Sequence, residues 1–258
     1  MLRPRIIPCL LVRNKGLVKT VGFQDGKYVG DPINAVRIFN EKEADELMII
    51  DIDATAKSQE PDIGMIKKWA AECRMPLCYG GGVHSVSHAK TIIGLGVEKV
   101  AISSAAIANP QLIAEIAGEV GNQSVIVVLD VRRNKSGEHE VFTHNGVRGT
   151  GREPGDLVQE FQNLGAGEIV VNCIDRDGTM QGYDIELARR MRDASKVPMT
   201  FLGGAGSLDD MRFLFSELGI MGAAAGSLFV FKGIYKAVLI NYPSPETKDL
   251  LIRKALAL

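Results

Sequence analysis

The stretch Pro76-Leu77-Cys78-Tyr79-Gly80-Gly81-Gly82-Val83 decides the fold, because an apolar run of strand length ends in consecutive glycines. Ser85 follows, a residue type that commonly caps a helix, so the stretch predicts a strand, a turn and a helix. Glycines between a strand and a helix let backbone N–H groups approach an anion closely. One such unit is weak support for a phosphate site, since most glycine turns bind nothing.

The unit has a twin in Pro198-Met199-Thr200-Phe201-Leu202-Gly203-Gly204-Ala205-Gly206-Ser207, displaced by 122 residues. Residues 44–50 match 166–171 at the same spacing, residues 6–13 match 125–132, and residues 96–105 have a looser counterpart in 219–228. Four strand-like units repeated in order make eight. We therefore predict one α/β domain over residues 1–258, a closed (β/α)8 TIM barrel with half-barrels at about 1–122 and 123–258.

The predicted elements alternate along the chain. Apolar runs near 5–12, 46–52, 76–80, 99–103, 124–129, 168–174, 198–202 and 223–226 fit parallel strands buried on both faces, with helical segments between them. Residues 13–31 are predicted to be a long polar loop, and residues 132–152 suggest a short hairpin excursion.

Composition narrows the class of protein. The net charge is −1, which offers no broad electrostatic surface for nucleic acid, and no apolar run approaches the length of a membrane span. The four cysteines form no CxxC pair, and three of them lie in or beside strand patterns. Buried thiols of this kind indicate a reducing compartment, so we expect a cytoplasmic protein with no membrane association.

The carboxyl ends of barrel strands normally carry the active site. Asp130 ends the most apolar strand, where partial loss of water should raise its pKa and suit general acid–base chemistry. Asp51 ends another strand. For any single Asp at a strand end, a helix cap or a turn is an equally good interpretation.

Two phosphate cradles are predicted at this end of the barrel. Each combines glycines with hydroxyl groups from the next strand end: Gly81 and Gly82 with Ser103 and Ser104, and Gly203 and Gly204 with Gly226 and Ser227. Two cradles on opposite sides of one opening imply a long substrate with a phosphate at each end. Alternatively, the duplication left a second cradle that is unused.

The opposite end carries a charge pattern. Arg5, Glu46, Lys99 and Glu168 stand at the N-terminal ends of four predicted strands. Charges around the opening at this N-terminal end of the barrel are costly to desolvate unless they neutralise one another. They are either solvated strand-end charges or a charged gate on an axial passage.

Metal ligands are sparse in the sequence. His84 and His88 are four residues apart at a helix start, but the sequence shows no third ligand. Asp175-Arg176-Asp177-Gly178 lacks the remainder of a calcium loop. We expect neither a metal nor an organic cofactor.

The ordered set of motifs resembles the HisF family, the cyclase subunits of imidazole glycerol phosphate synthase, over nearly the whole chain. The matching segments are Arg5-Ile6-Ile7-Pro8-Cys9-Leu10, Ala44-Asp45-Glu46-Leu47, Gly80-Gly81-Gly82, Gly165-Ala166-Gly167-Glu168-Ile169, Asp175-Arg176-Asp177-Gly178-Thr179 and Gly203-Gly204-Ala205-Gly206. The set is specific although each segment alone is not.

The resemblance implies a barrel that receives ammonia from a HisH-like glutaminase docked at its N-terminal face. The ammonia would pass the gate and react with a bis-phosphate ribonucleotide imine, giving imidazole glycerol phosphate and an aminoimidazole carboxamide ribotide. Lys19, Asp51 and Asp130 match catalytic positions of the family, and all four gate residues have counterparts. Asp177 and Gly178 join the implied phosphate-binding set.

One departure from the family bears on catalysis. The family has Cys-Leu-Asp at the end of the first strand, with that Asp as one of two catalytic carboxylates, whereas this chain has Cys9-Leu10-Leu11. The repeat shows the same asymmetry, since Asp130 has Leu11 as its partner. Ser103 replaces a usual Asn and Leu202 a usual Ser, which affects the expected substrate more than the fold.

Three functions therefore stay open. The first is a cyclase in which Asp51 or a water replaces the lost carboxylate. The second is a paralogue whose ammonia serves a separate enzyme, for example to form an amidine on a surface-polysaccharide sugar of the O-antigen (lipopolysaccharide) type. The third is a non-catalytic partner that only activates a glutaminase.

Overall fold

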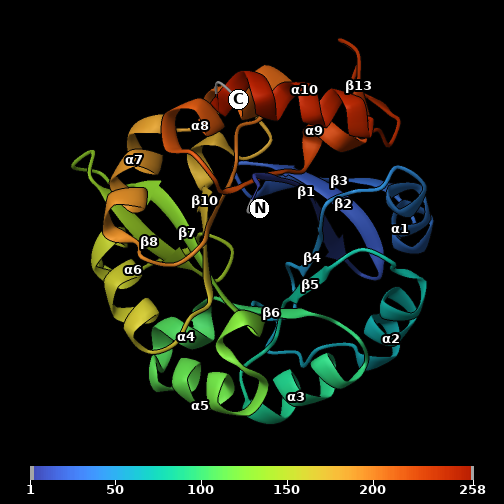
Figure 1. The fold of residues 1–258 in the computed structure, drawn as a ribbon. Helices are drawn as coiled ribbons and strands as arrows, with labels where there is room; N and C mark the ends of the chain where they lie inside the picture. The colour runs from blue at the N-terminus through green and yellow to red at the C-terminus, as the bar shows by residue number, and fades with distance from the viewer. Residues whose placement is uncertain (1–2, 257–258) are drawn as a thin grey trace.

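Eight parallel strands close into a barrel in the computed structural model, which describes residues 3–256 (Figure 1). In the order in which they neighbour one another, the strands are β1 (Arg5–Arg13), β4 (Leu47–Asp51), β5 (Leu77–Gly80), β6 (Lys99–Ile102), β7 (Val125–Arg133), β10 (Glu168–Cys173), β11 (Met199–Leu202) and β12 (Gly222–Ala225). β12 pairs with β1, and β7 pairs with β10, so the ring is complete. The predicted fold class is confirmed.

Helices surround the barrel on the outside (Figure 1). They are α1 (Pro32–Glu41), α2 (Ile63–Glu72), α3 (Val86–Gly94), α4 (Ser104–Ala108), α5 (Gln111–Val120), α6 (Pro154–Asn163), α7 (Ile185–Ala194), α8 (Leu208–Leu218), α9 (Ser227–Val230) and α10 (Pro245–Leu256), with short 3-10 turns at Asn122–Ser124 and Ile174–Arg176. Ser85 accepts a hydrogen bond from the backbone N–H of His88, which confirms the predicted N-cap of α3. Ser207 and Asp210 form a capping box at the equivalent start of α8.

Alternate residues along each strand divide the core into two layers. One set points outward and packs under the helices, as Ile6, Leu47 and Ile49 do. The other set fills the barrel interior: Ile7, Cys9, Met48, Cys78, Ala101, Ile126, Val170 and Ala224. This alternation follows from the two-residue period of a strand, and it places the strand ends at a common rim.

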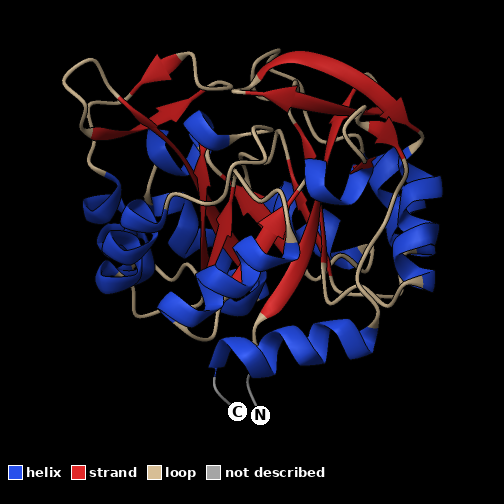
Figure 2. Ribbon diagram, turned by 90° about the horizontal axis from the view of Figure 1, so that it is seen from above, coloured by secondary structure: helices blue, strands red, loops and turns tan. Residues whose placement is uncertain are grey.

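Two hairpins stand over the carboxyl ends of the strands (Figure 2). Residues 13–31 were predicted to be a loop, and this was wrong, because they form β2 (Gly16–Val21) and β3 (Gln24–Gly30). Asn14 and Lys15 form the tight turn that joins β1 to β2, and both have the positive φ that such a turn requires, 49° and 66°. The predicted excursion within 132–152 is confirmed: β8 (His139–Thr143) pairs with the end of β7, and β9 (Arg148–Gly149) pairs with β8.

The last helix, α10, lies on the side of the barrel where the strands begin, opposite the two hairpins (Figure 2). The Tyr242 hydroxyl donates to the backbone oxygen of Ile6 at 2.8 Å, and the Lys248 ammonium donates to Asp45 at 2.7 Å. These contacts fasten the C-terminal segment, which also contains the small hairpin β13 (Phe231–Lys232) and β14 (Ala237–Val238). Within residues 3–256, no helix has both the length and the apolar character needed to cross a bilayer.

Candidate active site

A cavity opens at the carboxyl ends of the strands, beneath the two hairpins. It encloses about 1340 Å³, including the space at its open mouth. It is lined by all the residues predicted to act in catalysis or phosphate binding: Lys19, Asp51, Gly81, Gly82, Ser103, Ser104, Asp130, Asp177, Gly178, Gly203, Gly204, Gly226 and Ser227. The structure thus brings the predicted residues together, while their roles stay predictions.

Asp130 lies on β7 directly across from Asn172 of β10, whose side-chain amide donates to Asp130 Oδ1 at 2.9 Å. Burial raises the pKa of Asp130 to about 6; the Asn172 hydrogen bond opposes this and the Asp177 charge adds to it. A carboxyl group with this pKa can take up or release a proton near neutral pH. Asn172 was not predicted, although a polar residue inside the apolar run of β10 was a signal for it.

Asp51 is partly occupied by local structure. Its Oδ1 accepts the backbone N–H groups of Asp53 at 3.0 Å and Ala54 at 3.2 Å, which forms a turn at the end of β4. Burial raises the pKa of Asp51, and these two hydrogen bonds oppose the rise. One carboxylate oxygen of Asp51 therefore stabilises a turn, and only the other oxygen is available to a substrate.

The β2–β3 hairpin carries a cation into the cavity. Lys19 of β2 is buried, and its ammonium donates to the backbone oxygen of Cys9 at 2.7 Å. Burial lowers the pKa of Lys19. A Cβ on Gly226 would collide with this ammonium, so the glycine provides the room for it.

Asp177 holds the same hairpin in place. Its Oδ2 accepts the Thr20 hydroxyl at 2.7 Å and the backbone N–H of Phe23 at 3.2 Å. Burial raises the pKa of Asp177, while these bonds and the Lys19 charge oppose the rise. Asp177 is thus well placed to close the cavity mouth with the hairpin, a role distinct from the predicted phosphate contact.

The glycines of the two predicted cradles adopt backbone conformations that other residues rarely take. Gly82 has φ +71°, and a Cβ there would lie 2.6 Å from the backbone oxygen of Gln59. Gly203 has φ +98°, and its Cβ would lie 2.5 Å from the backbone oxygen of Cys173. Glycine is therefore required in both turns, which leaves their backbone free to face the cavity.

The hydroxyl groups beside the glycines lie at the starts of α4 and α9. Ser103 Oγ is buried and has no hydrogen-bond partner within residues 3–256. Ser104 Oγ accepts only a long bond, 3.4 Å, from the backbone N–H of His144. Unused hydroxyls aimed at a cavity fit a ligand that accepts hydrogen bonds. His144, which also lines the cavity, was not predicted, and nothing in the sequence distinguished it.

Leu11 belongs to an apolar layer that forms the floor of the cavity. It packs with the partly buried Ile50, Val128 and Leu202 on top of the inner core. These side chains come from β1, β4, β7 and β11, and all four line the cavity. Leu11, the counterpart of Asp130 in the internal repeat, is therefore a packing residue that cannot exchange a proton.

The four charges at the N-terminal end form one connected cluster. Arg5 pairs with Glu46 and with Glu168, the latter at 2.6 Å, while Lys99 lies 2.9 Å from Glu46 and 3.0 Å from Glu168. Glu46 and Glu168 are buried, so the interpretation as solvated charges does not hold. Burial alone would raise the pKa of Glu168, but Arg5 and Lys99 outweigh it and hold the pKa well below its usual range.

Comparisons with known proteins agree with this architecture. The family described as "Histidine biosynthesis protein" matches residues 5–236. A Leptospira borgpetersenii protein, provisionally named imidazole glycerol phosphate synthase subunit HisF, is 56% identical over 97% of this chain and 99% of its own length. The provisionally named subunit hisF2 of Pseudomonas aeruginosa is 49% identical over 97% of this chain and 100% of its own. The subunit HisF of Alkaliphilus metalliredigens, named without that qualifier, is 39% identical over 91% of this chain and 93% of its own.

Proposed function

The chain belongs to the histidine biosynthesis protein family, and we propose that it is a HisF-type cyclase subunit of a glutamine amidotransferase complex. In this proposal a HisH-like glutaminase docks at the N-terminal face of the barrel. Ammonia passes through the barrel interior and is used at a bis-phosphate ribonucleotide held in the cavity at the opposite end.

The single observation that carries the proposal is the buried cluster of Arg5, Glu46, Lys99 and Glu168. A buried ion cluster is a poor way to stabilise a fold, because apolar replacements of similar volume are often as stable or more so. Its presence at the end of the barrel opposite the cavity mouth supports a role in admitting a small polar molecule. The inner layer above it includes the small side chains of Cys9, Cys78 and Ala101.

The chemistry needs proton transfers as nitrogen adds to an electrophilic carbon and the imidazole ring closes. Asp130, whose pKa burial raises to about 6, suits such transfers, and Asn172 orients its carboxyl group. Lys19 supplies a positive charge beside the site. The two cradles would hold both phosphates and fix the substrate between them, which accelerates reaction by orientation.

We expect Lys99→Met to uncouple glutamine hydrolysis from ammonia use. Among residues 3–256, the change leaves Arg5 as the one cation beside Glu46 and Glu168, with Thr200 as a neutral donor to Glu168, so the cluster has two negative charges and one positive charge. In a reconstituted complex, product formed per glutamine hydrolysed should fall several-fold, while turnover with added ammonium salt changes little. Lys90→Met, which breaks only the exposed pair with Glu119, is the matched control. Equal loss of both activities would show that the cluster serves stability alone.

We also expect an anion site in each cradle. Crystals soaked in concentrated phosphate or sulfate should show one ion near Gly82 and Ser104 and another near Gly204 and Ser227. Ser104→Ala and Ser227→Ala should each weaken bis-phosphate binding by about tenfold, the loss typical of one hydrogen bond to a charged group. Ser136→Ala, in the exposed β7–β8 turn, should leave binding unchanged. Soaks that fill neither cradle would contradict a substrate with two phosphates.

Leu11 favours a second candidate function. Because leucine cannot exchange a proton, the ammonia could serve a separate enzyme that forms an amidine on a surface-polysaccharide sugar. The ion cluster and glutaminase docking would then be kept while cyclisation is lost. A third function would keep only the docking: the chain would activate the glutaminase and catalyse no reaction itself. Incubating the complex with glutamine and the ribonucleotide imine separates these functions, because only a cyclase yields imidazole glycerol phosphate.

A further inference from the structure

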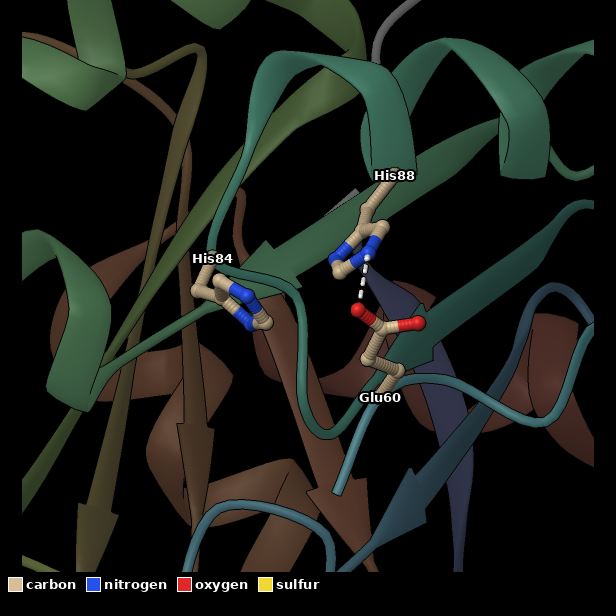
Figure 3. Close-up of side chains that lie close together, drawn as sticks. All are labelled: Glu60, His84 and His88. Atoms are coloured by element: carbon tan, nitrogen blue, oxygen red, sulfur yellow. Dashed lines mark ion pairs between the residues drawn. The ribbon is translucent and has the colours of Figure 1, made fainter. Parts of the chain in front are cut away.

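Three side chains outside the cavity lie together at the start of α3. Ligand atoms of Glu60, His84 and His88 all lie within 4.8 Å of one another, and no other such group of His, Cys, Asp or Glu occurs in residues 3–256. Figure 3 shows the two imidazoles and the carboxylate pointing toward a shared space. We propose that they form a binding site for a divalent transition metal ion, with Zn²⁺ the best match.

The helix start places both histidines. Ser85 caps α3, so His84 precedes the cap and His88 lies in the first turn, where its backbone N–H donates to Ser85 Oγ at 3.2 Å. The two rings meet edge to face, with centroids 4.6 Å apart. The spacing of four residues noted in the sequence therefore brings both imidazoles to one side.

The third ligand comes from the loop between β4 and α2, which the sequence could not bring near the histidines. The loop is anchored on both sides of Glu60: the backbone N–H of Gln59 donates to Ala54 at 2.7 Å, and Pro61 is buried. Gly82 packs so closely on Gln59 that a Cβ would come within 2.6 Å of its backbone oxygen. The glycine turn thus fixes the loop against the start of α3.

The separations suit a shared ion better than a direct bond. Glu60 Oε1 lies 3.8 Å from His88 Nε2, which is too far for a hydrogen bond. Two ligand atoms that each lie about 2.0–2.2 Å from a tetrahedral zinc ion are roughly 3.3–3.6 Å apart, so binding would draw Glu60 and His88 slightly together. The carboxylate is mostly exposed, so a fourth position at the ion would be open to water.

Hydrogen bonding prepares His84 as a ligand. Its Nδ1 lies 2.8 Å from the backbone oxygen of Gly82, which can only accept, so Nδ1 carries the proton and Nε2 has a free lone pair. Metal-binding histidines almost always have the second nitrogen held in this way. His88 has a ring nitrogen, Nδ1, that is buried without a partner in the described chain. The other ring nitrogen of His88, Nε2, is the one that faces Glu60 and would bind the ion.

An ion here would join the β4–α2 loop to the start of α3. Both segments border Gly82, which lines the cavity, so the ion would stiffen one rim of the cavity without entering it. The proposal depends on neither the cyclase nor the amidine function.

The test uses the full-length protein, freed of metals with a chelator, and zinc chloride as the probe. Equilibrium dialysis should find one zinc ion per chain, and the melting temperature should rise with zinc. His88→Ala and Glu60→Gln should each weaken binding by at least about tenfold, since even partners behind the ligands are worth about 10–100-fold. Glu119→Gln, an equal loss of charge on α5, is the matched control and should bind as the unmodified chain does.

Glu60→Gln keeps the test decisive if His88→Ala folds poorly, because the Glu60 side chain is 77% exposed and its loss cannot open the core. Unchanged zinc binding in a folded Glu60→Gln protein would overturn the proposal. So would the absence of saturable binding by the unmodified chain. Binding that is lost only when the four cysteines are alkylated would place the ion at thiols and would equally contradict it.

Discussion

Asp130→Asn should lower turnover of the ribonucleotide imine with ammonium salt by about 10²–10⁴-fold, the usual contribution of a general acid or base. Asparagine keeps the shape of the side chain and can still pair with Asn172 across β7 and β10, so the change removes the proton and little else. The measurement is steady-state formation of imidazole glycerol phosphate. If the unmodified chain makes none, the prediction transfers to the Leu11→Asp background described below.

The same substitution should also change how the stability of the fold depends on pH. Burial raises the pKa of Asp130 from its ordinary value of 3.8 to about 6, so the folded protein binds this proton more tightly than the unfolded chain. The stabilisation from protonation is complete below about pH 3.8 and is lost as the pH rises through about 6. Asp130→Asn should therefore gain stability relative to the unmodified chain as the pH rises from 4 to 8.

Chemical unfolding of both proteins at these two pH values measures the difference, and groups common to both cancel. Asp193→Asn, on the exposed face of α7, is the control and should show no such pH dependence and no loss of turnover. A turnover loss of less than about threefold in a correctly folded Asp130→Asn protein would remove Asp130 from the chemistry.

The barrel could be predicted because each strand and helix has a signal in its own short stretch of sequence, and because these signals repeat along the chain. Each barrel strand is a short, mostly apolar run, and several helices begin at a recognisable cap such as Ser85. The repeat of four units predicts eight strands. The division into half-barrels near residue 122 stays a prediction. Residues at strand ends meet at one rim in any such barrel, which is why Asp51, Asp130 and the glycines could be placed together.

The remaining parts of the site depend on contacts between distant segments. The β2–β3 hairpin forms because Gly22 and Phe23 adopt positive φ in its turn and because Asp177 holds Thr20, a partner 157 residues away. Lys19 was identified through the family resemblance, since no local pattern points a lysine into a barrel. Glu60 reaches His88 only because Gly82 packs on the loop beside it.

The second large effect is expected from Leu11→Asp. If the chain has kept the family's substrate, restoring a carboxyl group across from Asp130 should raise cyclase turnover by about 10²-fold or more, since one acid or base commonly contributes 10²–10⁴-fold. The new carboxyl group would enter the layer formed by Ile50, Val128 and Leu202, so some stability should be lost. Lys19, whose ammonium lies against the backbone oxygen of Cys9, offers it a positive charge nearby.

Leu11→Asn is the control that separates the effect of a proton-exchanging group from the effect of a smaller, polar side chain. Both variants shorten the side chain by the same amount and put a polar group in an apolar layer, but only Asp can exchange a proton near neutral pH. We expect the Asp variant alone to gain turnover with saturating ammonium salt. If the unmodified chain already turns over at about 1 s⁻¹, an ordinary enzyme rate, then Leu11 is tolerated and the missing carboxylate is no impairment. If neither variant gains while both still bind and stimulate the glutaminase, the substrate itself has changed, and the separate ammonia acceptor becomes the better account of why the ion cluster was kept.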